Sequence, residues 1–181
     1  MEQFDYLKLS KEISYALRHA PWEYELELDE EGWVSTKQLL FSLRENKQWT
    51  NISEEQLVKM IALSEKKRHE IRNGKIRAHY GHSLPMKIKK REQNPPDVLY
   101  HGTTLKSKEN IETEGLQPRQ RQYVHLSEDL KTALDVGKRR EEEPVILVIN
   151  AQQAHTDGIK FYYGNEKVWL ADYIPANYID F

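Results

Sequence analysis

The chain has 181 residues, of which 38% are hydrophobic and 31% charged, and its formal net charge is −2. This length and apolar content can form one domain or two small lobes with their own cores. The absence of cysteine excludes disulfides, a thiolate nucleophile and cysteine-ligated zinc. The first residues lack the pattern of a signal peptide, and no apolar run approaches the ~20 residues of a membrane span. We therefore expect a cytoplasmic protein that does not enter a membrane.

The chain begins with an expected amphipathic helix. Apolar residues recur at helical spacing from Leu9 to Leu17, and Ala20–Pro21 ends the pattern. Arg18 and His19 therefore fall in the last turn of this helix. The alternation at 26–28 then predicts a short strand.

Two more helices and a hairpin are expected before residue 80. Ser35 or Thr36 can cap a helix that carries leucines at 39, 40 and 43. The run Ser53–Gln56 has the pattern of a capping box that opens a third helix. Asn73–Gly74 is the strongest short hairpin signal, and it lies between extended runs at 68–71 and 75–78. The order helix, strand, helix, helix, hairpin is that of a winged-helix domain.

A polar stretch ending in Pro95–Pro96 reads as a linker, because a proline pair continues neither a helix nor a central strand. The residues beyond it are mainly strand-forming. A helix at 106–114 should end at Gly115, and Ser127 should cap a second helix. Neither a Rossmann nor a P-loop phosphate motif is present. The expected strands are 98–101, 123–126, 144–149, 161–163, 168–170 and 178–181.

Positive charge is concentrated between Glu65 and Arg91, where ten Lys/Arg face two acids, an excess of 10 − 2 = +8. The run can bind a polyanion, or it can be a solvated hairpin and linker, because charge runs usually face water. Histidines at 69, 79 and 82 lie among these cations. Imidazoles in this setting suit phosphate or sugar contacts better than a metal ion.

Seven short motifs together resemble the NAD-dependent RNA 2′-phosphotransferase family. They occur in one order and with compatible spacing, so the resemblance covers about residues 9–181 and is specific. The motifs are Leu17–Pro21, Asp29–Val34, Lys66–Arg68, Ile76–Ala78, Gly81–Ser83, Leu99–Thr103 and Tyr123–Ser127.

The resemblance implies an α+β protein with an N-terminal winged-helix RNA-binding lobe at 1–94 and a C-terminal, β-rich lobe related to ADP-ribosyltransferases at 95–181. It implies an active site in a cleft between them and two substrates, NAD⁺ and an RNA with an internal 2′-phosphate, for example at a tRNA splice junction. The RNA phosphate would first displace nicotinamide, giving a 2′-phospho-ADP-ribosyl RNA intermediate. That intermediate would then release ADP-ribose 1″,2″-cyclic phosphate. We expect no metal requirement and a monomer.

The family's catalytic set carries over to Arg18, His19, Arg68 and Arg121. By resemblance, the first three bind the RNA 2′-phosphate and Arg121 supports transesterification. Guanidinium forks suit a phosphate dianion, and a histidine can add a hydrogen bond or move a proton. Read alone, Arg18 could be a cation that interacts with the helix dipole, and Arg121 a solvated loop residue.

By the same resemblance, the strand end His101–Thr103 lies where ADP-ribosyltransferases hold NAD⁺. Gly102 would let the backbone approach the dinucleotide, while His101 and Thr103 offer hydrogen bonds. His125 and Ser127 follow on the next strand, and Gly137 and Arg139 match a further family stretch. Read alone, a strand histidine is more often a core residue, and the cations at 138–140 could form a solvated helix end.

Two other functions stay open. An ADP-ribosyltransferase acting on protein or on nucleic-acid phosphate ends would use the same NAD⁺ site but would not need Arg18, His19 and Arg68. A noncatalytic winged-helix module would explain the basic run but not His101–Thr103. The late-strand glutamate of protein-modifying ADP-ribosyltransferases is missing from Lys167–Leu170, which suits a phosphate acceptor that is already ionised.

Overall fold

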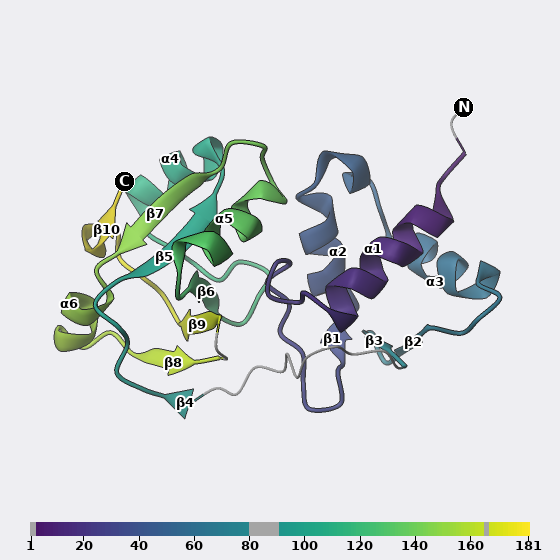
Figure 1. The fold of residues 1–181 in the computed structure, drawn as a ribbon, viewed down its shortest axis with the longest axis horizontal. Helices are drawn as coiled ribbons and strands as arrows, with labels where there is room; N and C mark the ends of the chain where they lie inside the picture. Colours follow the sequence, from purple (N-terminus) through teal and green to yellow (C-terminus); the bar gives the residue numbers. More distant parts are fainter. Residues whose placement is uncertain (1–2, 80–90, 165–166) are drawn as a thin grey trace. The chain divides into compact units, whose positions relative to one another are not determined.

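A computed structural model describes residues 3–79, 91–164 and 167–181. It divides into two compact units, Met1–Lys87 and Ile88–Phe181 (Figure 1). The boundary expected at 94/95 comes after the one in the structure. The reason is that β4 (Arg91–Glu92) pairs with β8 (Phe161–Tyr163) and so joins the sheet of the second unit. The Gly81–Ser83 motif and the lysines of the basic run at 87, 89 and 90 lie outside the described residues.

The first helix, α1 (Tyr6–Arg18), confirms the prediction from helical spacing. Asp5 caps it by accepting a hydrogen bond from the backbone N–H of Lys8 at 2.9 Å. Its apolar face is fully buried from Leu9 to Leu17, while Arg18 and His19 lie at its C-terminal end. The helix therefore anchors the two polar residues to the core of the first unit.

Two more helices complete the helical part of this unit. In α2 (Thr36–Arg44), the Ser35 hydroxyl accepts from the Gln38 N–H, as expected. In α3 (Glu54–Leu63), the Ser53 N–H donates to the Gln56 side chain at 2.8 Å, which confirms the capping box. A short 3-10 helix, η1 (Lys47–Trp49), connects them. Their leucines and Trp49 pack with α1 into one core.

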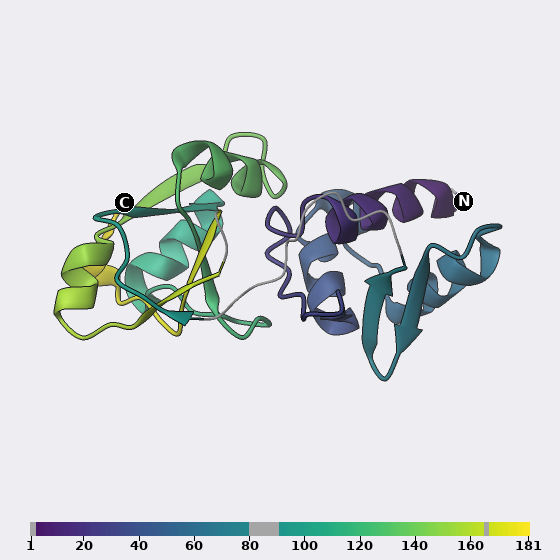
Figure 2. The ribbon, with the colours of Figure 1, turned by 60° about the horizontal axis from the view of Figure 1, so that its bottom comes forward.

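A small antiparallel sheet closes the first unit, in the order β1 (Val34–Ser35), β3 (Lys75–Ala78), β2 (His69–Arg72). The hairpin prediction is confirmed: β2 and β3 pair around a turn in which Asn73 and Gly74 have φ of 51° and 74°. Figure 2 shows this turn protruding from the unit.

The strand expected at 26–28 is wrong. Leu26 and Leu28 are buried, but the segment has no strand partner. The Glu27 N–H instead donates to the Gln38 side chain of α2 at 2.6 Å. Alternating burial therefore arises here without a ladder, and the strand of the expected element order is Val34–Ser35.

The second unit is built on a seven-stranded sheet in which every pair is antiparallel. The six strands predicted in this half are present with small shifts at their ends, whereas β4 escaped prediction because it is short and polar. The order across the sheet is β10 (Ile179–Asp180), β7 (Val145–Ile149), β5 (Leu99–Thr103), β6 (Val124–Ser127), β9 (Val168–Ala171), β8 and β4.

Three helices and a short 3-10 helix, η2 (Ala176–Tyr178), accompany this sheet. As expected, α4 (Leu105–Glu114) ends at Gly115, which has φ 75°. The expected cap of α5 (Leu130–Lys138) is wrong: Ser127 lies in β6, and Asp129 caps the helix by accepting from the Thr132 N–H at 2.7 Å. A third helix, α6 (Ala151–Thr156), was not expected from the sequence.

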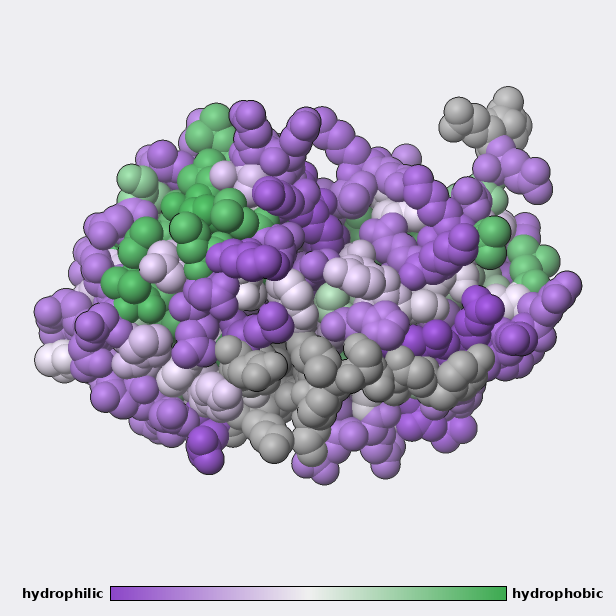
Figure 3. Space-filling view, in the orientation of Figure 1, coloured by the Kyte–Doolittle hydropathy of each residue, from purple (hydrophilic) through white to green (hydrophobic). Residues whose placement is uncertain are grey.

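The fold is therefore mixed α and β, with a separate hydrophobic core in each unit. Figure 3 shows an apolar area over β7, where Val145, Ile146 and Val148 are only half-buried. Among the described residues, no helix is both long enough and apolar enough to span a bilayer.

Candidate functional site

One group of expected site residues lies in the first unit, where α1 ends and β2 begins. Arg18 is the last residue of α1, and the backbone N–H of the C-cap residue His19 donates to the Tyr15 carbonyl at 3.0 Å. Arg68 directly precedes β2, and its carbonyl accepts from the His79 N–H at 2.9 Å. Two elements far apart in sequence thus position the two arginines.

The charges of both arginines affect the pKa of one buried histidine, His69. His69 is only 2% exposed, and its Nε2 lies 3.1 Å from the Ser14 Oγ of α1. Burial, together with the positive charges of Arg18 and Arg68, lowers the pKa of His69 to about 4. His69 is therefore neutral at pH 7, and positive potential from both guanidiniums converges around it.

The second group lies in the second unit, around His101. Its Nδ1 is 3.0 Å from the His125 carbonyl oxygen. Burial, helped by the charges of Arg121, His125 and Arg119, lowers the pKa of His101 to about 4 although the hydrogen bond to the His125 carbonyl acts in the opposite direction. Because a carbonyl oxygen only accepts, the neutral imidazole carries its hydrogen on Nδ1 and keeps Nε2 as an acceptor. The strand β5 thus holds one imidazole in one tautomer beside two arginines.

The loop before β6 brings the two arginines to this position. The Arg121 N–H donates to the Pro118 carbonyl at 3.1 Å, and Arg119 between them has a positive φ of 58°. Such a conformation is uncommon for a residue with a side chain and often occurs at functional sites. Arg121 therefore lies in a defined turn, where the residue is half-buried.

Gly102 and Gly137 have a structural reason of their own. A Cβ on Gly102 would lie 2.0 Å from the Ala133 carbonyl oxygen of α5, and a Cβ on Gly137 would lie 2.6 Å from the Cβ of Pro144. Gly102 therefore lets α5 cross β5 closely, and Gly137 makes room on α5 for Pro144. The expected reason for Gly102, approach of a dinucleotide, is not needed to explain glycine at this position.

A residue that the sequence analysis missed supports the same strand. Arg140 donates from Nη1 to the Gly102 carbonyl at 3.1 Å, and burial lowers its pKa to about 10, so it stays charged at pH 7. Its place in a run of cations followed by three glutamates resembles a solvated helix end. No local pattern in the sequence distinguishes it from its neighbours.

The remaining expected residues are distributed around these groups. Thr103, His125 and Ser127 are buried in the paired strands, and Ser127 lies opposite Tyr100. Arg139 is the half-buried C-cap residue of α5. The structure thus gathers His101, Gly102, Arg121, His125 and Gly137 around β5.

Guanidinium and imidazole groups predominate in both groups, a composition typical of proteins that bind phosphorylated ligands. Within 3–79, 91–164 and 167–181, no three His, Asp or Glu side chains come together as metal ligands would.

Comparison with known proteins identifies the family. The family model described as RNA 2′-phosphotransferase, Tpt1 / KptA family, matches residues 5–173. The chain is 61% identical over its full length to all of a probable RNA 2′-phosphotransferase from Acetivibrio thermocellus. A protein of the same description from Bacillus thuringiensis is 59% identical over 96% of this chain and 94% of its own length. A third, from Pyrococcus horikoshii, is 41% identical over 95% of this chain and 96% of its own length. The chain belongs to the RNA 2′-phosphotransferase family.

Proposed function

We propose that this protein is an enzyme that removes an internal 2′-phosphate from RNA and transfers it to NAD⁺. Besides family membership, one observation carries the proposal: Arg18 and Arg68, from separate elements, both lower the pKa of the buried His69 through their charges. A phosphate monoester is nearly a dianion at pH 7, so a pair of guanidiniums matches it in charge and in hydrogen-bonding geometry.

In the proposed function, side chains of the first unit bind the RNA 2′-phosphate. Arg18 and Arg68 donate to the non-bridging oxygens, and His19, exposed at the helix end, adds a hydrogen bond. Because His69 is neutral at pH 7, it does not add a third positive charge beside the two arginines. The clamp thus relies on the packing of α1 against β2 through the Ser14–His69 contact.

The second unit provides residues that fit NAD⁺. The free lone pair on His101 Nε2 can accept a hydrogen bond from a ribose hydroxyl, and Thr103 offers a hydroxyl next to it. Arg119 and Arg121 are cations close enough to lower the pKa of His101, so they can also stabilise the negative pyrophosphate. His125, Ser127, Gly137 and Arg139 complete this proposed site.

The proposed reaction has two displacements. An oxygen of the RNA 2′-phosphate forms a bond to C1″ of the nicotinamide ribose, and neutral nicotinamide leaves with the C–N bonding pair. In the resulting 2′-phospho-ADP-ribosyl RNA, the ribose O2″ then attacks phosphorus. The RNA 2′-oxygen leaves and takes up the proton lost by O2″, which yields ADP-ribose 1″,2″-cyclic phosphate. Arg121 stabilises charge on the phosphoryl oxygens during this second step.

The test is incubation of the protein with NAD⁺ and an RNA oligonucleotide carrying one internal 2′-phosphate, without added metal. We expect nicotinamide, ADP-ribose 1″,2″-cyclic phosphate and RNA with a plain 2′-hydroxyl. A stable ADP-ribosyl adduct would instead indicate an ADP-ribosyltransferase. Binding without reaction would indicate a noncatalytic RNA-binding protein.

Two single substitutions should separate formation of the intermediate from its breakdown. Arg121→Ala should accumulate the 2′-phospho-ADP-ribosyl RNA, whereas Arg18→Ala should slow its formation. Gel separation of the RNA species over time measures both. The division of roles is wrong if Arg121→Ala still performs the first step and no intermediate collects.

A further inference from the structure

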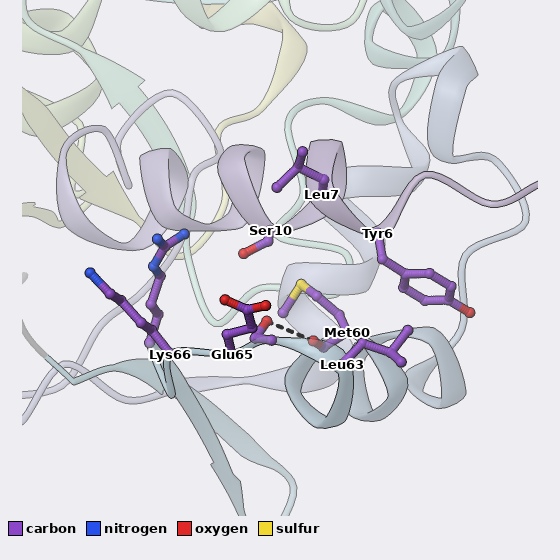
Figure 4. A pocket seen from close by; sticks show the side chains of 9 residues that line it. Tyr6, Leu7, Ser10, Met60, Leu63, Glu65 and Lys66 are labelled. Atoms are coloured by element: carbon purple, nitrogen blue, oxygen red, sulfur yellow. Dashed lines mark hydrogen bonds between the residues drawn. The ribbon is translucent and has the colours of Figure 1, made fainter.

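A hollow in the first unit lies next to the proposed phosphate clamp and shares Arg68 with it. It has a volume of about 320 Å³ and is formed by the start of α1, the end of α3 and the segment that leads to β2 (Figure 4). The lining residues are Tyr6, Leu7, Ser10, Met60, Leu63, Ser64, Glu65, Lys66 and Arg68.

One part of the lining is apolar and open to water. Leu7 and Leu63 are 64% and 59% exposed, and Met60 beneath them is buried. Two leucines that are exposed beside a hollow lose contact with water when a flat apolar ligand enters, which favours binding.

The rest of the lining is polar. The Ser64 hydroxyl donates to the Met60 carbonyl at 2.8 Å and so is already engaged. Figure 4 shows Ser10 pointing from α1 toward the hollow, with Glu65 and Lys66 along the opposite side. A carboxylate can accept from the amino or imino groups on the edge of a base, while a hydroxyl can both donate and accept.

We propose that this hollow binds an unpaired nucleobase of the RNA substrate, a few nucleotides from the one that carries the 2′-phosphate. The proposal rests on the proposed function and adds a second contact point for the same RNA. The apolar side chains contact the faces of the base, Ser10 and Glu65 meet its edge, and Lys66 with Arg68 offers positive charge to the adjoining backbone phosphates.

The lining is less suited to other occupants. A phosphate group alone could pair with Lys66 and Arg68, but it would be repelled by Glu65 and would leave the exposed leucines uncovered. A purely apolar helix of a partner protein would have to cover Lys66 and Arg68 and remove them from water without pairing them. A nucleotide combines an apolar face, a polar edge and a negative backbone, and it matches all three parts of the lining.

The register along α1 gives the distance between the two contact points. Ser10, Ser14 and Arg18 are spaced by four residues, so they lie along one face of the helix. Ser10 lines the hollow, Ser14 contacts His69, and Arg18 belongs to the clamp. Eight residues at ~1.5 Å each separate the ends by ~12 Å. At the ~3.4 Å rise of a stacked strand, this corresponds to about three or four nucleotides.

The experiment measures RNA binding in the absence of NAD⁺, so that no reaction occurs. A fluorescent single-stranded RNA with one central 2′-phosphate is compared with a series in which one position within four nucleotides of it is abasic. Each is titrated with wild type, Leu63→Ser and Val58→Ser. Val58 is the matched control, because it is an exposed apolar residue of α3, 52% exposed, that does not line the hollow.

We expect one abasic position to weaken binding to the wild type about 5-fold or more, as loss of a base contact does. Leu63→Ser should weaken binding of the intact RNA to a similar extent and should lose nothing further with that abasic RNA. Val58→Ser should behave as wild type. Glu65→Gln should change which base is preferred at the same position.

The proposal is overturned if no abasic position matters to the wild type, or if Leu63→Ser and Val58→Ser have equal effects. Either result would mean that the exposed leucines of the lining bind a protein partner or no ligand at all. Failure of the proposed function is a different result: base-dependent binding to the hollow without removal of the 2′-phosphate when NAD⁺ is added. Conversely, removal that is equally efficient with every abasic RNA refutes the hollow as a base site and leaves the proposed function intact.

Discussion

At the scale of single residues, the phosphate clamp depends on charges that the fold brings together from distant positions. Arg18 and Arg68 are 50 residues apart in sequence, yet both lower the pKa of His69. Arg77 and Arg72 belong to the same basic run but lie near Glu70, with Nε of Arg77 at 2.5 Å and Nη2 of Arg72 at 4.0 Å from its carboxylate. Arg77 also packs over the Trp33 ring at 4.5 Å. Neighbouring arginines therefore have different tasks.

This difference predicts the effect of arginine substitutions. Arg18→Ala and Arg68→Ala should each reduce kcat/KM for removal of the 2′-phosphate on the order of 100-fold or more, because a positioned charge donor is lost. Arg72→Ala should leave kcat/KM within a few-fold of wild type, because its side chain is 68% exposed and paired only at 4.0 Å. Rates at saturating NAD⁺, with thermal unfolding to verify folding, measure this. Near-normal turnover of a folded Arg18 or Arg68 variant would refute the clamp.

The neutral state of His69 predicts how stability depends on pH. In the unfolded chain this imidazole binds a proton below pH 6.5, whereas in the folded protein its pKa is about 4. Between these values the unfolded state binds more protons, so the free energy of unfolding falls as the pH is lowered, by about 1 kcal/mol per pH unit. Urea unfolding of wild type and His69→Gln at pH 7, 6 and 5 measures it. The wild type should lose more stability than the variant, and parallel losses would contradict the assignment.

At the scale of elements, local signals were sufficient where each element carries its own start or stop. The Asn73–Gly74 turn, the Ser35 and Ser53 caps and the stop at Gly115 are all as predicted. Errors occurred where a contact from elsewhere replaced the local signal. Gln38 satisfies the backbone of Glu27, so residues 26–28 need no partner strand.

The candidate site shows the same limit. Arg18, Arg68 and His101 could be selected from the sequence because they stand in motifs at the ends of recognisable elements. Arg140 could not be selected, because its role depends on the Gly102 carbonyl, which is 38 residues away. The glycines at 102 and 137 were recognised, but their close contact with α5 and Pro144 depends on how helix and strand cross. Long-range packing is the information that local patterns lack.

The crossing of α5 over β5 predicts what alanine does at position 102. Its Cβ would lie 2.0 Å from a backbone oxygen, which cannot rotate away, so α5 must move. We expect Gly102→Ala to lower the free energy of unfolding by about 2 kcal/mol or more, as overpacking does. Gly137→Ala, whose Cβ would meet the Pro144 side chain, should cost less. Urea unfolding measures both. If Gly102→Ala instead keeps full stability and loses only NAD⁺ affinity, approach of the dinucleotide is the reason for glycine.

At the scale of the whole molecule, charge is unevenly divided along a chain whose net charge is only −2. Of the excess of 10 − 2 = +8 between Glu65 and Arg91, 7 − 2 = +5 lies in the first unit and the other +3 at the start of the second. Part of this charge is internally paired, because the Arg77 side chain donates to Glu70 and thereby lowers the pKa of that carboxyl. We therefore expect the remaining lysines of the run to supply the nonspecific attraction for RNA phosphates.

A triple charge reversal tests this expectation. Replacing Lys87, Lys89 and Lys90 with glutamate should weaken RNA binding about equally for all sequences, because phosphate contacts do not read bases. The slope of log affinity against log salt should flatten by about 0.7 for each lost contact with single-stranded RNA. The control reverses three exposed lysines outside the basic run, Lys106, Lys131 and Lys160, which gives the same change in net charge. NAD⁺ affinity should be unchanged in the first variant, since none of its three lysines belongs to the proposed NAD⁺ site. Equal salt slopes for both triple variants would mean that the basic run is a solvated surface and that overall charge alone governs RNA binding.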